Sequence, residues 1–272
     1  MKISLNSTAA LNNKTAIPLL GLGTWQLAEG KEAEQAVLWA LEAGYRHIDT
    51  AMIYRNELSV GVAIKKSRIA RKDIFVTTKL WNSDHDDPAK ALSDSLKQLN
   101  MSYVDLYLIH WPVPERNKTW KILEKLYKDG KCKAIGISNF SIAQTEELLK
   151  TAEIIPAANQ VEFHPWLYQK ELWEYCRKKK IQLEAYSPLA RAEKMSDARL
   201  KEIAKAYAKS PAQIILRWCI QKGIVAIPKS SRKERIMENS NIFDFELRGE
   251  DIKKIDSFNE DYHAVPDYSR DR

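Results

Sequence analysis

The chain has 272 residues, of which 44% are hydrophobic and 29% charged, and its formal net charge is +7. This composition is ordinary for a globular protein, and the length suits one large α/β domain or two small ones. Acidic and basic residues are interspersed and form no long basic tract of the kind that nucleic-acid binders carry, so we expect no nucleic-acid partner.

The cysteines and the apolar segments indicate the compartment in which the protein is expected and whether it has a membrane span. Cys132, Cys176 and Cys219 are widely spaced and form no C-x-x-C pair, which argues against a disulfide framework or a zinc site. We therefore expect reduced thiols, a cytoplasmic location and no bound metal. Residues 1–15 lack the apolar core of a signal peptide. No apolar run approaches the roughly 18 residues that a membrane span needs.

Eight short apolar runs, rich in β-branched and aromatic residues, are predicted to be strands. They lack strict polar alternation, which is typical of parallel strands buried on both faces. Before them, residues 1–17 are predicted to form an added β-hairpin that turns at Asn12 and Asn13. The runs are Pro18–Trp25, Tyr45–Thr50, Ile74–Leu80, Val104–Trp111, Lys133–Asn139, Ala157–Phe163, Ile181–Ser187 and Gly223–Ser230.

Helical patterns separate the runs. Glu32–Ala43 places apolar residues around one side, and Asp87-Pro88 has the form of an N-cap followed by proline at the first helical position. Ser210-Pro211-Ala212-Gln213 is a capping box with proline at the same position. The longest gap between strands has room for two helices, Ala198–Lys209 and Pro211–Lys222.

The spacing of the strand ends distinguishes two α/β folds. The first seven ends lie 21 to 31 residues apart, and a strand with its crossover helix needs about 30 residues. Eight such units predict a (β/α)8 TIM barrel with an N-terminal β-hairpin, built as a single domain from residues 1–272. A doubly wound open sheet would carry G-x-G-x-x-G after its first strand, and here Gln26 replaces the third glycine. The ends are Gly23, Asp49, Lys79, His110, Asn139, Gln160, Tyr186 and Ser230.

Residues with useful chemistry occur at three of these ends. Asp49 ends the second run, Lys79 the third and His110 the fourth, and Tyr54 follows Asp49 by five residues. Each of them alone is more often structural, as a helix cap, a surface lysine or a packed histidine. Strand ends in such a barrel meet at one rim, where catalytic residues gather. The four together therefore predict an active site.

Seven motifs follow one another along the chain. They are Gly21-Leu22-Gly23-Thr24-Trp25, Asp49-Thr50-Ala51 with Tyr54-Arg55-Asn56-Glu57, Lys79-Leu80-Trp81, Leu108-Ile109-His110-Trp111-Pro112, Gly136-Ile137-Ser138-Asn139-Phe140, Asn159-Gln160-Val161-Glu162 and Ile227-Pro228-Lys229-Ser230. In this order they resemble the aldo-keto reductase family over about residues 16 to 260. The resemblance is greatest to short-looped microbial and protozoan members, described as diketo-gluconate or methylglyoxal reductases and prostaglandin F synthases.

The resemblance implies reduction of an aldehyde or ketone with hydride from NADPH, chemistry that the cofactor supplies. Tyr54 would donate a proton to the developing alkoxide, although a phenol with a pKa of about 10 is a weak acid at neutral pH. A charged Lys79 would lower that pKa, and Asp49 would keep the lysine charged and in place. His110 would hydrogen-bond to the carbonyl oxygen.

A nicotinamide site is also implied by the resemblance. Ser138, Asn139 and Gln160 would clamp the carboxamide, and Tyr186 would stack on the other face of the ring. Further cofactor contacts are expected from Gly23, Thr24, Trp25, Asp49, Ser187, Leu189 and Ile227.

For the adenosine end, the resemblance implies a grip on the 2′-phosphate by Lys229, Ser230 and Arg235, and on the adenine by Glu238 and Asn239. Cations and a helix N-terminus are a natural site for phosphate. The family usually has Val-Thr-Pro after the serine, whereas this chain has Ser231-Arg232-Lys233. Whether Arg232 or Arg235 takes the phosphate therefore stays open.

Three of the eight tryptophans, Trp25, Trp81 and Trp111, fall at the expected rim and are predicted to form the substrate pocket with His110. Such a pocket suits small apolar or mixed carbonyl compounds. The short loops Val113–Thr119 and Leu189–Ser196 predict that it is open. The tryptophans predicted to be packing residues are Trp39, Trp120, Trp166, Trp173 and Trp218.

Two other histidines and two other functions complete the predictions. His47 and His164 lack catalytic neighbours in sequence, so we expect both to be structural and to hydrogen-bond to the backbone.

An aldolase that uses Lys79 for a Schiff base is one rival function. A non-enzymatic binding or regulatory protein on the same scaffold is the other. We expect a monomer.

Overall fold

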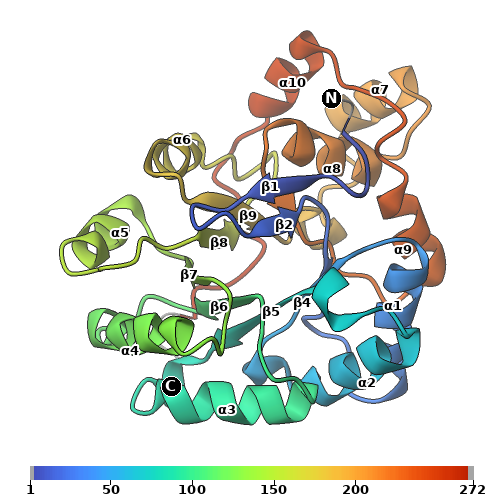
Figure 1. Ribbon diagram of the computed structural model, residues 1–272. Coiled ribbons are helices and arrows are strands. Elements are labelled where there is room, and N and C mark those ends of the chain that lie inside the picture. The colour runs from blue at the N-terminus through green and yellow to red at the C-terminus, as the bar shows by residue number, and fades with distance from the viewer. Residues whose placement is uncertain (1–2, 269–272) are drawn as a thin grey trace.

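The computed structural model describes residues 3–268, and within them a parallel eight-stranded sheet forms the centre of the molecule (Figure 1). Each strand lies inside one of the predicted runs and is shorter than the run, because residues at the run ends belong to the connecting loops. The strands are β3 (Leu22–Gly23), β4 (His47–Asp49), β5 (Phe75–Leu80), β6 (Leu106–Ile109), β7 (Ile135–Ser138), β8 (Ala158–Glu162), β9 (Gln182–Tyr186) and β10 (Val225–Ala226).

The sheet closes on itself. Strands pair in chain order from β3 to β10, and a parallel bridge joins Leu20 to Ala226. Gly23 N also donates to Pro228 O at 3.2 Å. A Cβ on Gly23 would lie 2.9 Å from the Ile227 carbonyl oxygen, so this close approach requires glycine. The first and last strands are therefore neighbours, and the predicted (β/α)8 barrel is confirmed.

Helices surround the sheet, as Figure 1 shows. The Asp87 side chain accepts from Lys90 N at the start of α3, and Ser210 forms the predicted capping box with Gln213 at the start of α8. Local capping chemistry thus begins these two helices where the sequence predicted. The helices are α1 (Lys31–Glu42), α2 (Glu57–Ser67), α3 (Pro88–Leu99), α4 (Arg116–Lys128), α5 (Ile142–Leu149), α6 (Lys170–Lys179), α7 (Ala198–Ala206), α8 (Pro211–Gln221), α9 (Lys233–Ser240) and α10 (Gly249–Asp256).

The predicted N-terminal hairpin is present, with β1 (Thr8–Ala10) antiparallel to β2 (Ala16–Pro18). Its loop spans residues 11–15 and is wider than a two-residue turn. The Asn12 amide donates to Pro156 O at 2.9 Å and the Asn13 amide to Lys133 O at 2.8 Å. Pro156 precedes β8 and Lys133 precedes β7, so the two asparagines anchor the hairpin to the amino-terminal end of the barrel.

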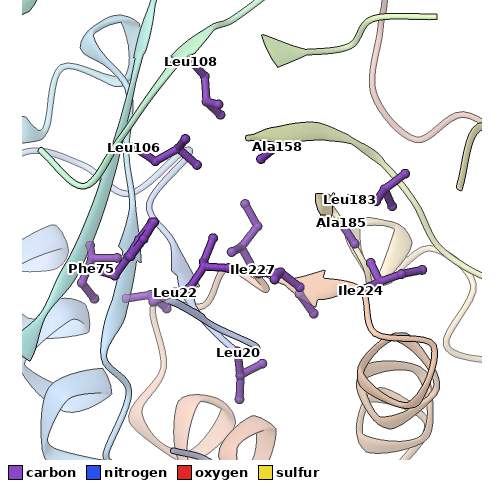
Figure 2. Close-up of a cluster of buried hydrophobic side chains, with 14 of the residues drawn as sticks. Leu20, Leu22, Phe75, Leu106, Leu108, Ala158, Leu183, Ala185, Ile224 and Ile227 are labelled. Atoms are coloured by element: carbon purple, nitrogen blue, oxygen red, sulfur yellow. The ribbon is translucent and has the colours of Figure 1, made fainter. Parts of the chain in front are cut away.

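Buried apolar side chains cluster around the strands of the barrel (Figure 2). They include Leu22 of β3, Leu106 of β6, Leu183 of β9 and Ile227, which follows β10. Among the described residues, no helix is long and apolar enough to span a membrane. Of the tryptophans predicted to pack, Trp120, Trp166 and Trp218 are fully buried, and Trp39 and Trp173 are half-buried.

The two structural histidines use different partners. His164 Nδ1 accepts from Leu167 N at 3.1 Å, as predicted for a backbone contact. His47 contacts the backbone of Pro18, and its Nε2 also lies 3.1 Å from the Thr77 hydroxyl. The register of β4 and β5, which pairs Asp49 with Thr77, brings the Thr77 side chain within reach of His47.

Candidate active site

Four side chains converge at the carboxyl end of the barrel. Asp49 ends β4, Lys79 lies in β5, His110 follows β6, and Tyr54 lies on a 3-10 turn, η1 (Met52–Tyr54). Lys79 Nζ lies 2.6 Å from Asp49 Oδ1 and 3.3 Å from Tyr54 Oη. Tyr54 Oη lies 3.5 Å from His110 Nε2. The structure therefore brings the three residues predicted at strand ends and Tyr54 into one continuous chain of contacts.

Lys79 and Asp49 form a buried ion pair. The side chain of Lys79 is 0% exposed and that of Asp49 is 3% exposed. Lys79 Nζ also donates to Thr50 O at 2.9 Å. Burial alone would favour a neutral amine, but the interactions with Asp49 and Tyr54 outweigh it, and the pKa of Lys79 lies above its usual value. The lysine is thus charged and held next to the phenol.

Two opposing effects act on Tyr54. Burial raises the pKa of Tyr54 above its usual value, the Lys79 ammonium opposes this rise, and the Asp49 carboxylate adds to it. Lys79 therefore acts in the predicted direction, and desolvation of the phenolate is the larger effect. At neutral pH the phenol keeps its proton.

His110 is neutral for a similar reason. Burial, and secondly the charge of Lys79, hold the pKa of His110 well below its usual value. The Trp81 ring packs edge-on to the imidazole, with ring centroids 5.1 Å apart. The backbone oxygen of His110 accepts from the Asn139 amide at 3.0 Å. A neutral, fixed imidazole can hydrogen-bond to an uncharged carbonyl oxygen without introducing a second cation beside Lys79.

A cavity of about 820 Å³ opens at these residues. Most of the predicted cofactor and substrate residues lie on its wall. Thr24, Lys79 and Ser138 instead lie behind the wall and are almost fully buried. The predicted residues on the wall are Gly23, Trp25, Asp49, Tyr54, Trp81, His110, Trp111, Asn139, Gln160, Tyr186, Ser187, Leu189, Ile227, Lys229, Ser230, Arg235, Glu238 and Asn239.

Amide groups and an aromatic ring stand next to the catalytic end of the cavity. Tyr186 Oη donates to Asn139 Oδ1 at 2.8 Å, and the Asn139 amide nitrogen also contacts Ser138 Oγ at 3.1 Å. Asn139 has φ of 63°, a left-handed conformation that asparagine tolerates better than most residues. Gln160 lies on the same part of the wall. These groups suit the flat ring and carboxamide of a nicotinamide.

Cations gather at the other end of the cavity. Lys229, Arg232 and Arg235 lie on the wall around the start of α9, and Ser230 Oγ accepts from Arg232 N at 3.1 Å. Lys233 is not on this wall, and its ammonium pairs with Glu42 at 3.3 Å. Three cations at a helix N-terminus suit a phosphate group. The cavity therefore fits a dinucleotide that has a nicotinamide at one end and a phosphate at the other.

Several wall residues were missed by the sequence analysis. Arg191 lies over the Trp25 ring, 5.2 Å from its centroid, on a 3-10 turn, η4 (Ala190–Ala192), whose three residues have φ of 45°, 51° and 69°. No periodic pattern predicts such a turn. The other missed residues are Gln26, Ile53, Pro188, Ala192, Met195, Ser210, Pro211, Ala212, Pro228, Ser231, Val265 and Tyr268.

The C-terminal segment also contributes to the cavity. Tyr268 packs edge-on to Trp111, with centroids 5.9 Å apart, and its backbone oxygen accepts from the Asn82 amide at 2.7 Å. The loops are short, as predicted, but this segment narrows the cavity on the side of Trp111. Its position depends on contacts far apart in sequence, so no local pattern could reveal it.

The comparison with known proteins decides the family. The profile of the aldo/keto reductase family matches residues 19–260 of this chain. The chain belongs to this family. It is 51% identical to the glyoxal reductase of Bacillus subtilis over 98% of both chains. It is 49% identical to a 9,11-endoperoxide prostaglandin H2 reductase of Trypanosoma cruzi, over 92% of this chain and 91% of the relative.

A solved structure agrees with this assignment. The aldo-keto reductase of Bombyx mori in complex with NADP superposes with a TM-score of 0.91 and 36% identity, covering 98% of this chain and 96% of the other. Membership of the family confirms the predicted resemblance, the barrel fold and the enzyme class, an oxidoreductase that acts on carbonyl groups. The resemblance to microbial and protozoan members is confirmed by the two relatives.

Proposed function

We propose that this aldo/keto reductase reduces aldehydes and ketones to alcohols with NADPH and uses Tyr54 as the general acid. The observation that carries the proposal is the contact chain Asp49–Lys79–Tyr54–His110 on the cavity wall. The cations at the far end of the same cavity support the choice of NADPH over NADH. The Bombyx mori relative, solved with NADP, supports the same cofactor.

The chain would hold the cofactor through three kinds of contact. Asn139 and Gln160 would hold the nicotinamide carboxamide, and Tyr186 would cover the ring. Lys229, Ser230 and the arginines of the α9 start would hold the 2′-phosphate, and Glu238 and Asn239 would contact the adenine. When bound, NADPH supplies the hydride.

Proton transfer is the task of the protein. A carbonyl compound lies between Tyr54 and His110, and both hydrogen-bond to its oxygen. Tyr54 gives its phenolic proton to this oxygen as the negative charge develops. Lys79, 3.3 Å from Tyr54 Oη, stabilises the phenolate that is left, and Asp49 keeps Lys79 in place. The neutral state of His110 lets it orient the substrate without competing for the proton.

We propose small α-oxoaldehydes as substrates. The name of the Bacillus relative, a glyoxal reductase, supports this class. The wall around Tyr54 carries the rings of Trp25, Trp81 and Trp111, which leave room for apolar substituents as well. A cytoplasmic, monomeric, single-domain enzyme is part of the proposal. The cytoplasmic location is supported by the three cysteines, which are buried and free of disulfides.

Oxidation of NADPH with glyoxal, methylglyoxal and an aromatic aldehyde tests the proposal. The wild type should turn over, and Tyr54→Phe should lower kcat by at least about 10²-fold, the usual size of a general-acid contribution. The dissociation constant of NADPH should stay within about twofold of that of the wild type, since the hydroxyl is not a cofactor contact.

Two outcomes would contradict the proposal. Near-normal turnover by Tyr54→Phe would remove Tyr54 as the proton donor. No NADPH oxidation by the wild type with any carbonyl compound would favour a binding or regulatory protein. Borohydride trapping of a keto substrate on Lys79 would favour the aldolase, but the amine of Lys79 is already occupied by Asp49, Thr50 and Tyr54.

A further inference from the structure

A second buried carboxyl group lies beneath the active site. Glu184, on β9, is 0% exposed, and its Oε2 lies 3.2 Å from Gln160 Nε2. The same amide nitrogen lies 2.8 Å from Asp49 Oδ2. The sheet register causes this contact, because Gln160 of β8 pairs directly with Glu184 of β9. Gln160 and Glu184 therefore extend the contact chain of the active site beyond Asp49.

The two carboxyl groups determine which way the Gln160 amide points. An amide nitrogen has two hydrogens, and here one can go to Asp49 and the other to Glu184. A flipped amide would turn its oxygen toward the Asp49 carboxylate and would leave Glu184 Oε2 without its hydrogen-bond donor. With the nitrogen occupied, Oε1 is the polar atom of the Gln160 side chain that is left to face a ligand. Gln160 lies on the cavity wall, so this ligand is the one in the cavity.

Within the described part of the chain, no unpaired cation lies beside Glu184, which favours the neutral form of its carboxyl group. His47 Nε2 lies 3.7 Å from Glu184 Oε1, but burial lowers the pKa of His47 to about 3, so this imidazole is neutral. Lys79 is paired with Asp49. Burial, and secondly the charge of Asp49, raise the pKa of Glu184 to about 8, against the smaller effects of Gln160 and Lys79. At neutral pH Glu184 is therefore protonated, and its Oε2 accepts from Gln160.

We propose that Glu184 is a positioning residue for the cofactor: with Asp49, it fixes the Gln160 amide so that Oε1 accepts a hydrogen bond from the nicotinamide carboxamide. This inference rests on the proposed function, in which Gln160 is a cofactor contact. It predicts discrimination between an amide and an acid on the pyridine ring. A carboxamide donates to Oε1, whereas a carboxylate has no hydrogen to donate and is repelled by that oxygen.

The probes are therefore NADP⁺ and its nicotinic acid analogue, and the readout is each dissociation constant from quenching of protein fluorescence. The wild type should prefer NADP⁺ by at least about tenfold, the effect of one hydrogen bond. Glu184→Met, which has similar volume but no acceptor, should reduce this preference to less than about threefold. Glu184→Gln should keep the preference, because its own amide oxygen can accept from Gln160.

Glu57→Met is the matched control. Glu57 is also a buried glutamate, and it accepts from the Thr78 hydroxyl at 2.6 Å, away from the cavity wall. This variant should lose stability and keep the preference of the wild type for NADP⁺. If Glu184→Met fails to fold, Glu184→Asp, whose carboxyl group is one methylene further from Gln160, should show a preference reduced by at least about threefold.

The outcomes separate the two proposals. Failure of the wild type to bind NADP⁺ would overturn the proposed function itself. If the wild type binds NADP⁺ and reduces aldehydes, but a folded Glu184→Met or Glu184→Asp keeps the full preference, the role of Glu184 is wrong and the proposed function stands. Equal loss of preference in Glu184→Gln and Glu184→Met would also contradict the role, because only the second removes the acceptor.

Discussion

Lys79 is the residue on which the site depends, because its single ammonium group contacts a carboxylate, a carbonyl and a phenol. Taking both partners of the Lys79–Asp49 pair out of water is costly, and their mutual contact at 2.6 Å, together with their other hydrogen bonds, offsets this cost. A substitution of Lys79 is therefore expected to change both the free energy of unfolding and the catalytic activity.

Lys79→Met should therefore abolish turnover and also destabilise the protein by about 3–5 kcal/mol, because it leaves Asp49 charged and unpaired. The double variant Asp49→Asn with Lys79→Met should recover most of this stability without recovering activity, since neither remaining side chain can support a phenolate. Urea unfolding and NADPH oxidation measure the two effects. Equal stability of the single and double variants would mean that Asp49 carries no charge that needs Lys79.

Residues of the site differ in how well the sequence predicts them. Asp49, Lys79 and His110 end apolar runs, and the geometry of a parallel barrel places such ends together. Gln160 was predicted only through the family resemblance. Glu184 was not predicted, because a single glutamate inside the run Ile181–Ser187 gives no sign of its partner. Its contact with Gln160 follows from strand register, which the sequence does not specify locally.

At the scale of elements, the start of α9 illustrates the same limit. The sequence predicted a cluster of cations after β10 but could not assign their directions. The structure places Arg232 and Arg235 on the cavity wall and pairs Lys233 with Glu42 outside it. Side-chain direction on a helix depends on where the helix begins, and here it begins at Lys233 itself.

Arg235→Ala should raise the dissociation constant of NADPH by about 10- to 100-fold and leave that of NADH nearly unchanged. The reason is that hydrogen bonds to charged groups contribute about 1.5–3 kcal/mol each, and NADH offers only a hydroxyl in place of the phosphate. Arg232→Ala, measured in the same way, shows whether the second arginine shares the phosphate.

Lys233→Ala is the control, since this lysine points away from the cavity, and both cofactors should bind it as they bind the wild type. Equal affinity of the wild type for NADPH and NADH would contradict the phosphate site at α9.

For the molecule as a whole, the barrel strands bury polar as well as apolar side chains. Leucines, isoleucines and Phe75 form an apolar cluster (Figure 2). A polar layer is buried with them and consists of His47, Asp49, Lys79 and Glu184, all at most 2% exposed. The sequence predicted the barrel because its strands are uniformly apolar. It could not predict the polar layer, because these polar residues of three strands, β4, β5 and β9, become neighbours only when the barrel closes.

The buried acid in this layer should make stability depend on pH. Burial, and then the charge of Asp49, raise the pKa of Glu184 from its usual value of 4.5 to about 8. Between these two values the folded state holds a proton that the unfolded state releases. Stability contributed by this group is therefore greatest below about pH 4.5 and falls as pH rises to about 8, by at most about 1.4 kcal/mol per pH unit.

Glu184→Gln removes this proton equilibrium and keeps the shape of the side chain. The melting temperature of this variant should therefore rise relative to that of the wild type as pH increases from 5 to 8, by several degrees in total. Thermal melts at four pH values in this range measure the difference. Glu42→Gln, at an exposed glutamate, should show no comparable trend. A constant difference between Glu184→Gln and the wild type across this range would mean that Glu184 is already ionised at pH 5, and that a charge which Lys79 cannot neutralise is tolerated inside the barrel.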